Sequence, residues 1–140
     1  MVTDGLRTAR RDIDFIVELD RNTKKSYDMI GVEPLMKIMS DELRNVLICR
    51  KNDSDLRQSA FENLCGRIYD MGLEGSFITR KNPLEIEYIP TGQKIVFRGL
   101  NNPTSLNSLT FAHGFLTDVY IEEAFELDSY ADFRKLRTVH

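Results

Sequence analysis

A basic loop near the start of the chain carries residues that could bind a phosphate group. Leu19–Gly31 (LDRNTKKSYDMIG) lies between an apolar run and a segment with helical spacing, and it contains Lys25 followed by Ser26. In a phosphate-binding loop, the lysine contacts the β- and γ-phosphates, the hydroxyl helps to coordinate Mg²⁺, and the helix N-terminus attracts the anion. The motif reads G-x-x-x-x-G-K-[ST], but Leu19 and Lys24 occupy its glycine positions here. Taken alone, the loop therefore fits a plain basic turn better than a nucleotide site.

Other residues of the same loop partly offset the missing glycines. Glycine normally lets the backbone take a positive φ and approach the phosphates without a Cβ in the way. Asn22 tolerates positive φ better than most residues, and Arg21 and Lys24 add positive charge. The candidate phosphate-binding residues are Arg21, Asn22, Thr23, Lys24, Lys25 and Ser26.

Two adjacent acids end a hydrophobic segment in the last third of the chain. In Leu116–Leu127 (LTDVYIEEAFEL), the apolar run stops at Glu122 and Glu123. A buried strand that ends in two acids is the Walker B arrangement, in which Glu122 would hold Mg²⁺ directly or through water and Glu123 would polarise the attacking water. Adjacent acids at a strand end are also common on solvated surfaces. We expect Asp118 and Glu126 to be surface or capping residues rather than ligands.

The two candidate elements support each other through their positions. Each follows a run that is predicted to be a strand, Asp14–Leu19 for the loop and Leu116–Ile121 for the acids. All strands of a parallel sheet deliver their carboxyl ends to the same edge, and ligands bind there. A shared edge would therefore place an ammonium group, a hydroxyl group and two carboxylates around one phosphate–magnesium position.

Two helices and a buried strand are predicted between these elements. The first helix should bend or restart near Pro34. Asn45–Cys49 (NVLIC) is a continuous apolar run, typical of a strand buried on both faces. The second helix should begin near Asp53 or Ser54, either of which could cap it, and end at Gly72. The apolar stripes expected in the core are Met29, Ile30, Leu35, Met36, Ile38 and Met39 in the first helix, and Leu56, Ala60, Phe61, Leu64, Cys65 and Ile68 in the second.

The pattern then changes to the alternation of a β-hairpin. Apolar residues alternate with glutamates in Leu84–Tyr88, and Pro90–Gly92 turns the chain toward Ile95–Phe97, which predicts an inserted antiparallel hairpin. Tyr88 and Phe97 fit packing within this hairpin better than a role as base-stacking platforms, because both lie within alternating strands. Asn101–Gly114 is a long polar loop, a kind of segment that is often functional. Ser129 should cap a last amphipathic segment. The order of elements predicts an α/β fold with a mostly parallel sheet flanked by helices.

Composition and charge describe an ordinary globular protein of about one domain. The 140 residues are 41% hydrophobic and 29% charged with a net charge of −3, so contact with nucleic acid or membrane would need a local patch. The sequence has no apolar run near the ~20 residues of a membrane span, and we expect no membrane contact. Cys49 and Cys65 should be buried free thiols rather than a disulfide or metal site. Residues 1–13 are predicted to be a flexible basic arm, and residues 14–140 one domain.

Three runs of the sequence resemble the N-terminal ATPase domain of phage terminase large subunits. They are RNVLICRKNDSDLRQSAFENL, NPLEIEYIPTGQKIVFRGLNNP and LTDVYIEEAFEL, and the likeness extends from about Asp14 to the C-terminus. The middle run is the most specific, because its hairpin leading to F-R-G-L is hard to explain by composition. The resemblance implies an incomplete RecA-like P-loop NTPase core that uses ATP and Mg²⁺ to drive double-stranded DNA into an empty procapsid. It also implies that the chain forms a homo-oligomer, that its partners are the phage portal and the small terminase subunit, and that it works in the cytoplasm of a bacterial host.

The resemblance also implies a role for individual residues of both candidate elements. Lys25 and Ser26 match the Walker A lysine and hydroxyl, and Arg21 matches the arginine usually found in that loop. Glu122 matches the metal-side acid of Walker B, and Glu123 matches the catalytic carboxylate. The resemblance therefore makes Glu123, Lys25 and Arg21 the catalytic candidates, and Ser26 and Glu122 the candidate ligands of Mg²⁺.

The sequence departs from the family pattern in three places. Both Walker A glycines are absent, Glu122 stands where many relatives have Asp, and the sequence stops before the ATPase-coupling motif and the nuclease domain. We therefore expect a motor fragment that binds ATP with Mg²⁺ and whose hydrolysis is weak or lost. One alternative is a non-catalytic interaction module that contacts DNA, portal or small-terminase surfaces. Another is a DNA-binding fragment with salt-sensitive affinity. Its basic residues would be Arg7, Arg10, Arg11, Arg50 and Lys51, of which the last two could instead be structural or contact phosphate.

Overall fold

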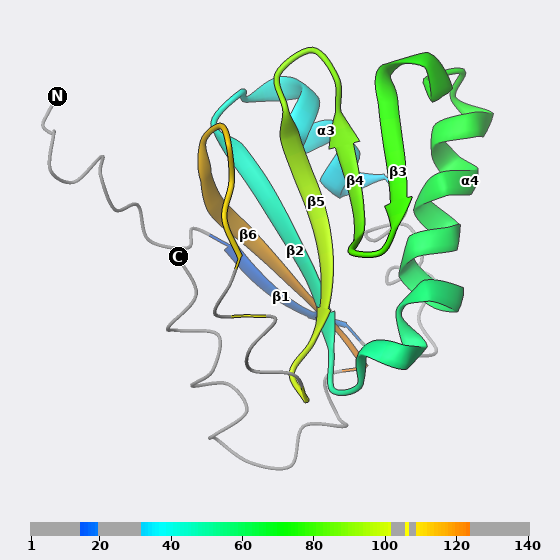
Figure 1. Ribbon diagram of the computed structural model, residues 1–140, viewed down its shortest axis with the longest axis vertical. Helices are drawn as coiled ribbons and strands as arrows, with labels where there is room; N and C mark the ends of the chain where they lie inside the picture. Colours follow the sequence, from blue (N-terminus) through cyan, green and yellow to red (C-terminus); the bar gives the residue numbers. More distant parts are fainter. Residues whose placement is uncertain (1–14, 20–31, 102–105, 107–108, 124–140) are drawn as a thin grey trace, which may run out of the picture.

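A six-stranded β-sheet forms the centre of the molecule in the computed structural model, which describes residues 15–19, 32–101, 106 and 109–123 (Figure 1). The strand order is β1-β6-β2-β5-β4-β3. The first four of these strands run parallel to one another, and β4 and β3 are antiparallel at one edge. The mixed α/β class with a mostly parallel sheet is thereby confirmed. The strands are β1 (Phe15–Leu19), β2 (Arg44–Arg50), β3 (Phe77–Lys81), β4 (Leu84–Tyr88), β5 (Gln93–Gly99) and β6 (Phe115–Glu122).

The three strands predicted from apolar runs are all present. β1 lies within the predicted Asp14–Leu19, and β2 and β6 each extend the predicted run by one residue at both ends. Val46 to Cys49 in β2 and Leu116 to Ile121 in β6 are buried, as expected for strands covered on both faces. These continuous apolar runs place β6 and β2 at the centre of the parallel part of the sheet.

The predicted hairpin is present, but it belongs to the main sheet rather than being inserted into it. β4 and β5 pair antiparallel around a turn in which Gly92 has φ +85°. β5 also pairs parallel with β2, with Val46 opposite Ile95, so the hairpin continues the sheet. A further strand, β3, was not predicted from the sequence, and it pairs antiparallel with β4 at the edge.

The first predicted helix is α3 (Glu33–Ser40), which carries Pro34 in its first turn. A helix therefore begins at this proline, which is tolerated in the first turn because its missing N–H costs nothing there. The expected bend or restart also depends on the segment before residue 32, which lies outside the described residues. Leu35 and Ile38 are buried in the core. Met36 is 51% exposed, so its expected place in the core is wrong: it lies on the outer side of the helix. Met29 and Ile30 lie outside the described residues.

The second predicted helix begins irregularly. A 3₁₀ turn (Asp53–Asp55) and a π turn (Arg57–Phe61) precede the regular helix α4 (Glu62–Asp70). No side chain caps any of these segments, so the expected cap by Asp53 or Ser54 is wrong. Instead, the backbone N–H of Asp53 donates to the Asn101 side chain at 3.2 Å. The helix ends as predicted at Gly72, which has φ +72°.

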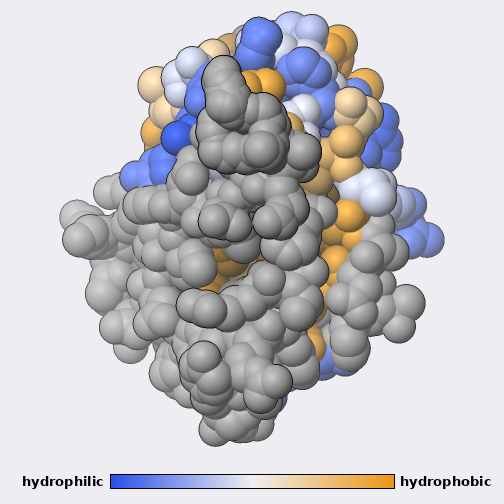
Figure 2. Space-filling model, turned by 90° about the vertical axis from the view of Figure 1, so that its left-hand side faces the viewer, coloured by the Kyte–Doolittle hydropathy of each residue, from blue (hydrophilic) through white to orange (hydrophobic). Residues whose placement is uncertain are grey.

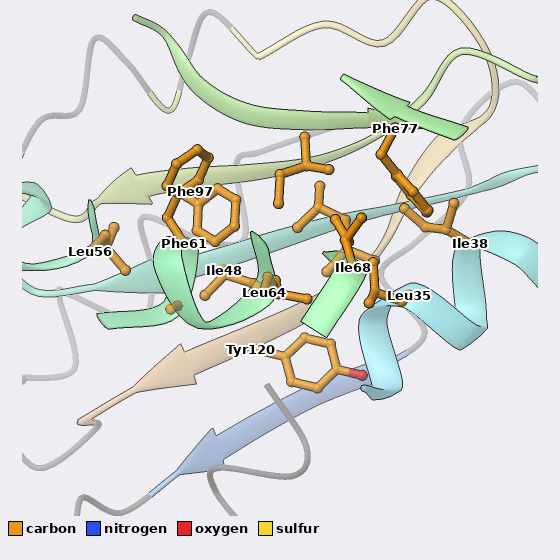
Figure 3. Close-up of a cluster of buried hydrophobic side chains, with 14 residues drawn as sticks. Leu35, Ile38, Ile48, Leu56, Phe61, Leu64, Ile68, Phe77, Phe97 and Tyr120 are labelled. Carbon is orange, nitrogen blue, oxygen red and sulfur yellow. The ribbon is translucent and has the colours of Figure 1, made fainter. Parts of the chain in front are cut away.

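The main hydrophobic core lies between the sheet and the helices α3 and α4 (Figure 3). The Phe61 and Phe97 rings meet edge to face with centroids 5.4 Å apart, and Phe77 lies 5.1 Å from Tyr88. The packing role predicted for Tyr88 and Phe97 is thus confirmed. Other buried members are Leu35, Ile38, Ile48, Leu56, Leu64, Ile68 and Tyr120. The side view in Figure 2 shows hydrophilic and hydrophobic side chains mixed at the top of the molecule, and a strip of hydrophobic side chains lower down on the right.

A second hydrophobic cluster covers the other face of the sheet. Leu106 and Leu109, from the segment predicted as a long polar loop, are buried with Leu100 against Leu47 of β2 and Val119 of β6. This segment therefore contributes to the core as well as connecting β5 to β6. Across the described ranges, no helix has the length and apolar character needed to cross a membrane.

Candidate functional site at the carboxyl edge of the sheet

The carboxyl ends of the four parallel strands meet at one edge of the sheet, toward the bottom of Figure 1. Leu19, the last residue of β1, lies directly opposite Glu122, the last residue of β6. On the other side of β6, Cys49 of β2 pairs with Ile121, so Arg50 ends β2 beside the same position. The chain therefore leaves β1 next to Glu122, which is the neighbourhood that ligands of parallel sheets favour.

The structure describes only one of the two candidate elements. Glu122 ends β6 and Glu123 follows it directly. The candidate phosphate-binding residues Arg21, Asn22, Thr23, Lys24, Lys25 and Ser26 lie outside the described residues, as do Glu126 and Ser129. Their predicted roles remain predictions, and the strand order brings only the beginning of their loop to Glu122.

Glu122 is largely buried and is held by two neighbours. Its Oε1 accepts a hydrogen bond from the Ser59 hydroxyl at 2.7 Å and lies 3.6 Å from Nη1 of Arg50. Burial raises the pKa of Glu122, the contacts from Ser59 and Arg50 oppose this shift, and the neighbouring Glu123 adds to it. Among the described residues, the hydrogen bond from Ser59 goes to Oε1, which is also the oxygen given for the Arg50 contact, and Oε2 accepts no hydrogen bond.

Arg50 bridges two acids at the end of β2. Besides its contact with Glu122, its Nε lies 3.8 Å from Asp55 Oδ2 in the 3₁₀ turn. Its side chain is only 16% exposed, and its carbonyl accepts from the N–H of Leu100 at 2.9 Å. These contacts fit the structural role that was one of the possibilities for Arg50.

Glu123 has an unusual backbone conformation. Its φ is +55°, and it is the only residue other than glycine with positive φ in the described part of the chain. Left-handed backbone costs a glutamate of order 1 kcal/mol or more, because its Cβ approaches the carbonyl oxygen. Conformations of this kind cluster at functional sites, which makes the sharp turn after β6 relevant to the role predicted for Glu123.

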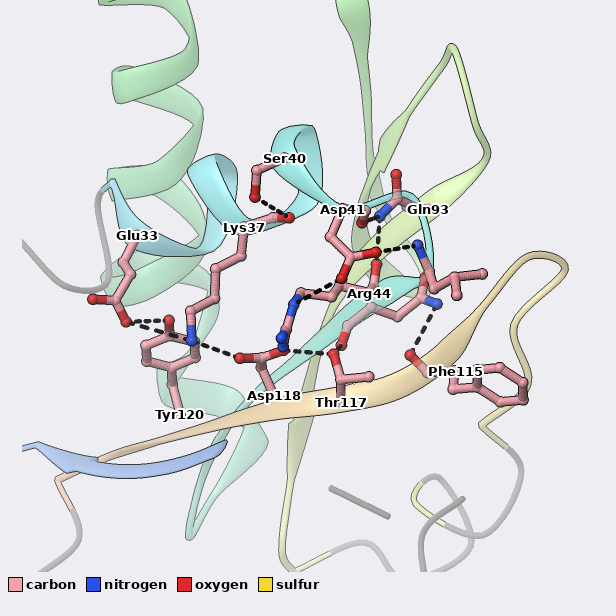
Figure 4. A network of polar contacts seen from close by, with 12 residues as sticks. Glu33, Lys37, Ser40, Asp41, Arg44, Gln93, Phe115, Thr117, Asp118 and Tyr120 are labelled. Carbon is pink, nitrogen blue, oxygen red and sulfur yellow. Dashed lines mark hydrogen bonds and ion pairs between the residues drawn. The ribbon is translucent and has the colours of Figure 1, made fainter. Parts of the chain in front are cut away.

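A buried ion-pair network fixes β6 against α3 (Figure 4). The Asp118 side chain is fully buried, and its carboxylate accepts from Lys37 Nζ at 2.7 Å and from Arg44 Nη1 at 2.8 Å. The expectation that Asp118 is a surface or capping residue is therefore wrong. Burial alone would raise the pKa of this carboxyl, but hydrogen bonds from Lys37, Thr117 and Arg44 outweigh burial and hold the pKa below its ordinary range.

A second contact joins the same two elements. The Tyr120 hydroxyl donates to Glu33 Oε1 at 2.6 Å, and Lys37 Nζ lies 5.9 Å from the centre of the Tyr120 ring. Asp118, Tyr120 and Glu122 alternate along β6 and so share the face covered by the helices. Because α3 is the helix that follows the predicted phosphate-binding loop, these contacts fix the helix after the loop relative to the strand that carries the acids.

The remaining polar features lie away from Glu122. Two hollows of about 350 and 400 Å³ both involve Pro83 and Arg98, and among the described residues neither is lined by Glu122 or Glu123. Both cysteines are free thiols; Cys49 is buried and Cys65 is partly exposed. Within the ranges that the structure covers, no three potential metal-ligating side chains gather at one point.

Parallel strands with acids at their common carboxyl edge define an α/β protein with a candidate site at the end of β6. The sequence matches the family described as phage terminase large subunit over residues 13–139, so the chain belongs to this family. It is also 27% identical over 114 residues to the PBSX phage terminase large subunit of Bacillus subtilis (strain 168), a match that covers 81% of this chain and 24% of the relative. The chain thus corresponds to about a quarter of the length of that protein.

Sequence reasoning missed Ser59 and Arg50 as partners of Glu122. The apolar stripe of the second helix was enough to predict that helix, so Ser59, a polar residue outside the stripe, carried no signal of its own. Its contact with Glu122 also spans 63 positions in the sequence. Arg50 was noted as basic, but a charge at a strand end does not show which acid it will meet.

Proposed function

We propose that this chain is the nucleotide-binding part of a phage DNA-packaging motor, with a RecA-like P-loop core in residues 14–140. It would bind ATP with Mg²⁺ at the carboxyl edge of the sheet and use the nucleotide to move double-stranded DNA into a procapsid. The observation that carries the proposal is the pairing of β1 with β6, which puts Leu19 opposite Glu122. The loop with Lys25 and Ser26 therefore starts beside the acids of β6.

The residues available at this edge fit a magnesium–phosphate complex. Mg²⁺ usually keeps several waters and takes one or two carboxylates plus phosphate oxygens, so it needs no cage of protein ligands. In this proposal, Glu122 and Ser26 hold the cation and Glu123 orients and polarises the attacking water. Lys25 and Arg21 would neutralise phosphate charge, with the rest of the loop, Asn22, Thr23 and Lys24, contributing further phosphate contacts.

The wider biological setting of the proposal rests on family membership. A large terminase subunit would work in the cytoplasm of the bacterial host, as a homo-oligomer, with the portal and the small terminase subunit as partners. Hydrolysis would be weak, because the two Walker A glycine positions carry Leu19 and Lys24.

Calorimetric titration of ATP with Mg²⁺ tests the proposal. The parent chain should bind, and Lys25→Ala should weaken binding because it removes the charge nearest the terminal phosphates. Lys81→Ala is a charge-matched control, since Lys81 is an exposed residue of β3 at the far edge of the sheet. A folded parent that does not bind ATP would overturn the proposal and favour a non-catalytic interaction module.

A further inference from the structure

A π turn at the start of the second helix brings Ser59 to the end of β6. The N–H of Phe61 donates to the carbonyl of Leu56 at 3.1 Å, five residues back, instead of the four of an α-helix. This wider turn carries Ser59, whose hydroxyl lies 2.7 Å from Oε1 of Glu122. π turns are rare and occur often at functional sites, which gives this contact particular interest.

The Ser59 hydroxyl has one proton and several acceptors around it. The carbonyl oxygens of Asp55 and Leu56 lie at 2.9 and 3.5 Å, and the Glu122 carboxylate is the nearest acceptor. A hydrogen bond to an ionised carboxylate is about twice as strong as one between neutral groups. When the carboxylate is ionised, the Ser59 hydroxyl therefore donates its hydrogen bond to Glu122 Oε1 in preference to the two carbonyl oxygens.

We propose that Ser59 is a positioning residue for the magnesium site, a role that rests on the proposed function. By holding Oε1 of Glu122, together with the longer contact from Arg50, it fixes the rotation of the carboxylate. Oε2, which accepts no hydrogen bond from the described residues, is then left for the cation or for one of its water ligands. Outer partners of this kind orient metal ligands in many proteins.

Another account of the same contact assigns Ser59 to the helix alone. Serine hydroxyls inside helices often bond to the carbonyl four residues back, as Ser59 can do with Asp55. In that case Glu122 would keep its orientation without Ser59, and the metal dependence of nucleotide binding would not change on mutation.

The experiment compares ATP affinity in Mg²⁺ and in EDTA for the parent chain and for Ser59→Ala. Loss of an outer partner typically weakens metal affinity by about 10- to 100-fold. We expect Ser59→Ala to reduce the increase in ATP affinity that Mg²⁺ produces by about tenfold. This value is at the lower end of that range because Arg50 still contacts the Glu122 carboxylate. The affinity in EDTA should stay the same. Ser59→Thr, which keeps a hydroxyl group, should restore the gain.

Ser40→Ala is the matched control for the loss of a helical hydroxyl. The Ser40 hydroxyl also donates to a backbone carbonyl, that of Lys37 at 3.1 Å, but it is exposed on α3 and has no contact with Glu122. In the background of Glu122→Gln, Ser59→Ala should have no further effect, because both changes act through the same carboxylate. Ser59→Cys, with a weak donor of similar size, is a second test if the alanine variant does not fold.

The outcomes separate this inference from the proposed function. ATP binding that gains nothing from Mg²⁺ in the parent would overturn both. A parent that gains from Mg²⁺ while Ser59→Ala and Ser59→Cys gain equally would overturn only the role of Ser59.

Discussion

Replacing Asp118 by asparagine should strongly destabilise the fold. Asparagine has nearly the same shape as aspartate, so the change removes the charge with little effect on packing. Lys37 and Arg44 would then face a neutral amide at the centre of the network that joins β6 to α3. Removing one partner of a buried ion pair typically costs about 3–5 kcal/mol, because the other charge is left unpaired.

Two features of the structure reduce the expected cost of removing the Asp118 charge. The Lys37 and Arg44 side chains are each 24% exposed, and each has a second acid nearby, Glu33 at 4.0 Å and Asp41 at 3.4 Å. We therefore expect a loss of about 2–3 kcal/mol in the free energy of unfolding, below the full penalty for a buried pair. For a domain of this size, that corresponds to a fall of about 6–15 °C in Tm.

Thermal and urea unfolding followed by circular dichroism would measure the loss. Asp70→Asn is the control, because Asp70 is exposed at the end of α4 and should change stability by less than about 0.5 kcal/mol. A Tm for Asp118→Asn within a degree or two of the parent's would refute the reasoning, since it would mean that the two cations do not depend on the carboxylate.

The pH dependence of the same comparison follows from the lowered pKa of Asp118. The folded state binds a proton at this carboxyl less tightly than the unfolded state, whose pKa is about 3.9. The stabilisation is therefore complete above about pH 4 and is lost as the pH falls through the lower folded-state value. The difference in stability between parent and Asp118→Asn should stay constant from pH 7 to 5 and shrink below about pH 4.

Two further predictions concern the packing around the site. Gly99→Ala should destabilise the fold by about 1–3 kcal/mol in urea unfolding, because the added Cβ would clash with the backbone nitrogen of Asp53. The control is Gly66→Ala, which lies on an open helix surface and should be neutral or stabilising. Equal effects of the two substitutions on stability would contradict the packing argument. Burial, with a smaller contribution from the negative charge of Glu122, raises the pKa of Cys49 to about 12. In a Cys65→Ser variant, iodoacetamide should therefore label Cys49 only as urea unfolds the chain, and rapid labelling of the native state would show that the thiol is accessible.

Contiguous apolar runs and turn residues made much of the fold predictable from the sequence. In a strand, the continuous apolar run from Val46 to Cys49 places apolar side chains on both faces of the sheet. Both faces are therefore expected to be buried, and the run forms a central strand. Gly72 and Gly92 both have the positive φ that their predicted positions require. In these places, local chemistry and the final fold favour the same structure.

Features that depend on distant partners could not be predicted in the same way. Asp118 binds residues 81 and 74 positions away, and no local pattern identifies Lys37 or Arg44 as its partners. An acid inside the apolar run LTDVYI was nevertheless a sign of a buried pair, because a charge in a buried strand needs compensation. The edge strand β3 also had local support in its β-branched residues Ile78 and Thr79, followed by a turn at Asn82 and Pro83.

The candidate site was predictable only in part. Parallel pairing placed the end of β6 beside the end of β1, as the order of elements suggested. The contacts that orient Glu122 come from Ser59 in the irregular start of the second helix and from Arg50 at the end of β2. A periodic apolar stripe predicts a helix, but it does not show that a π turn will move one of its polar residues over the sheet edge.

The most direct test of the account is the magnesium dependence of ATP affinity in Glu122→Gln. This change removes the charge that would hold the cation, while the amide oxygen can still accept from Ser59. The account predicts that most of the gain from Mg²⁺ disappears, that the affinity in EDTA is unchanged, and that Glu42→Gln, at an exposed position, behaves like the parent. An undiminished gain from Mg²⁺ in Glu122→Gln would show that the acid at the end of β6 is not part of the nucleotide site.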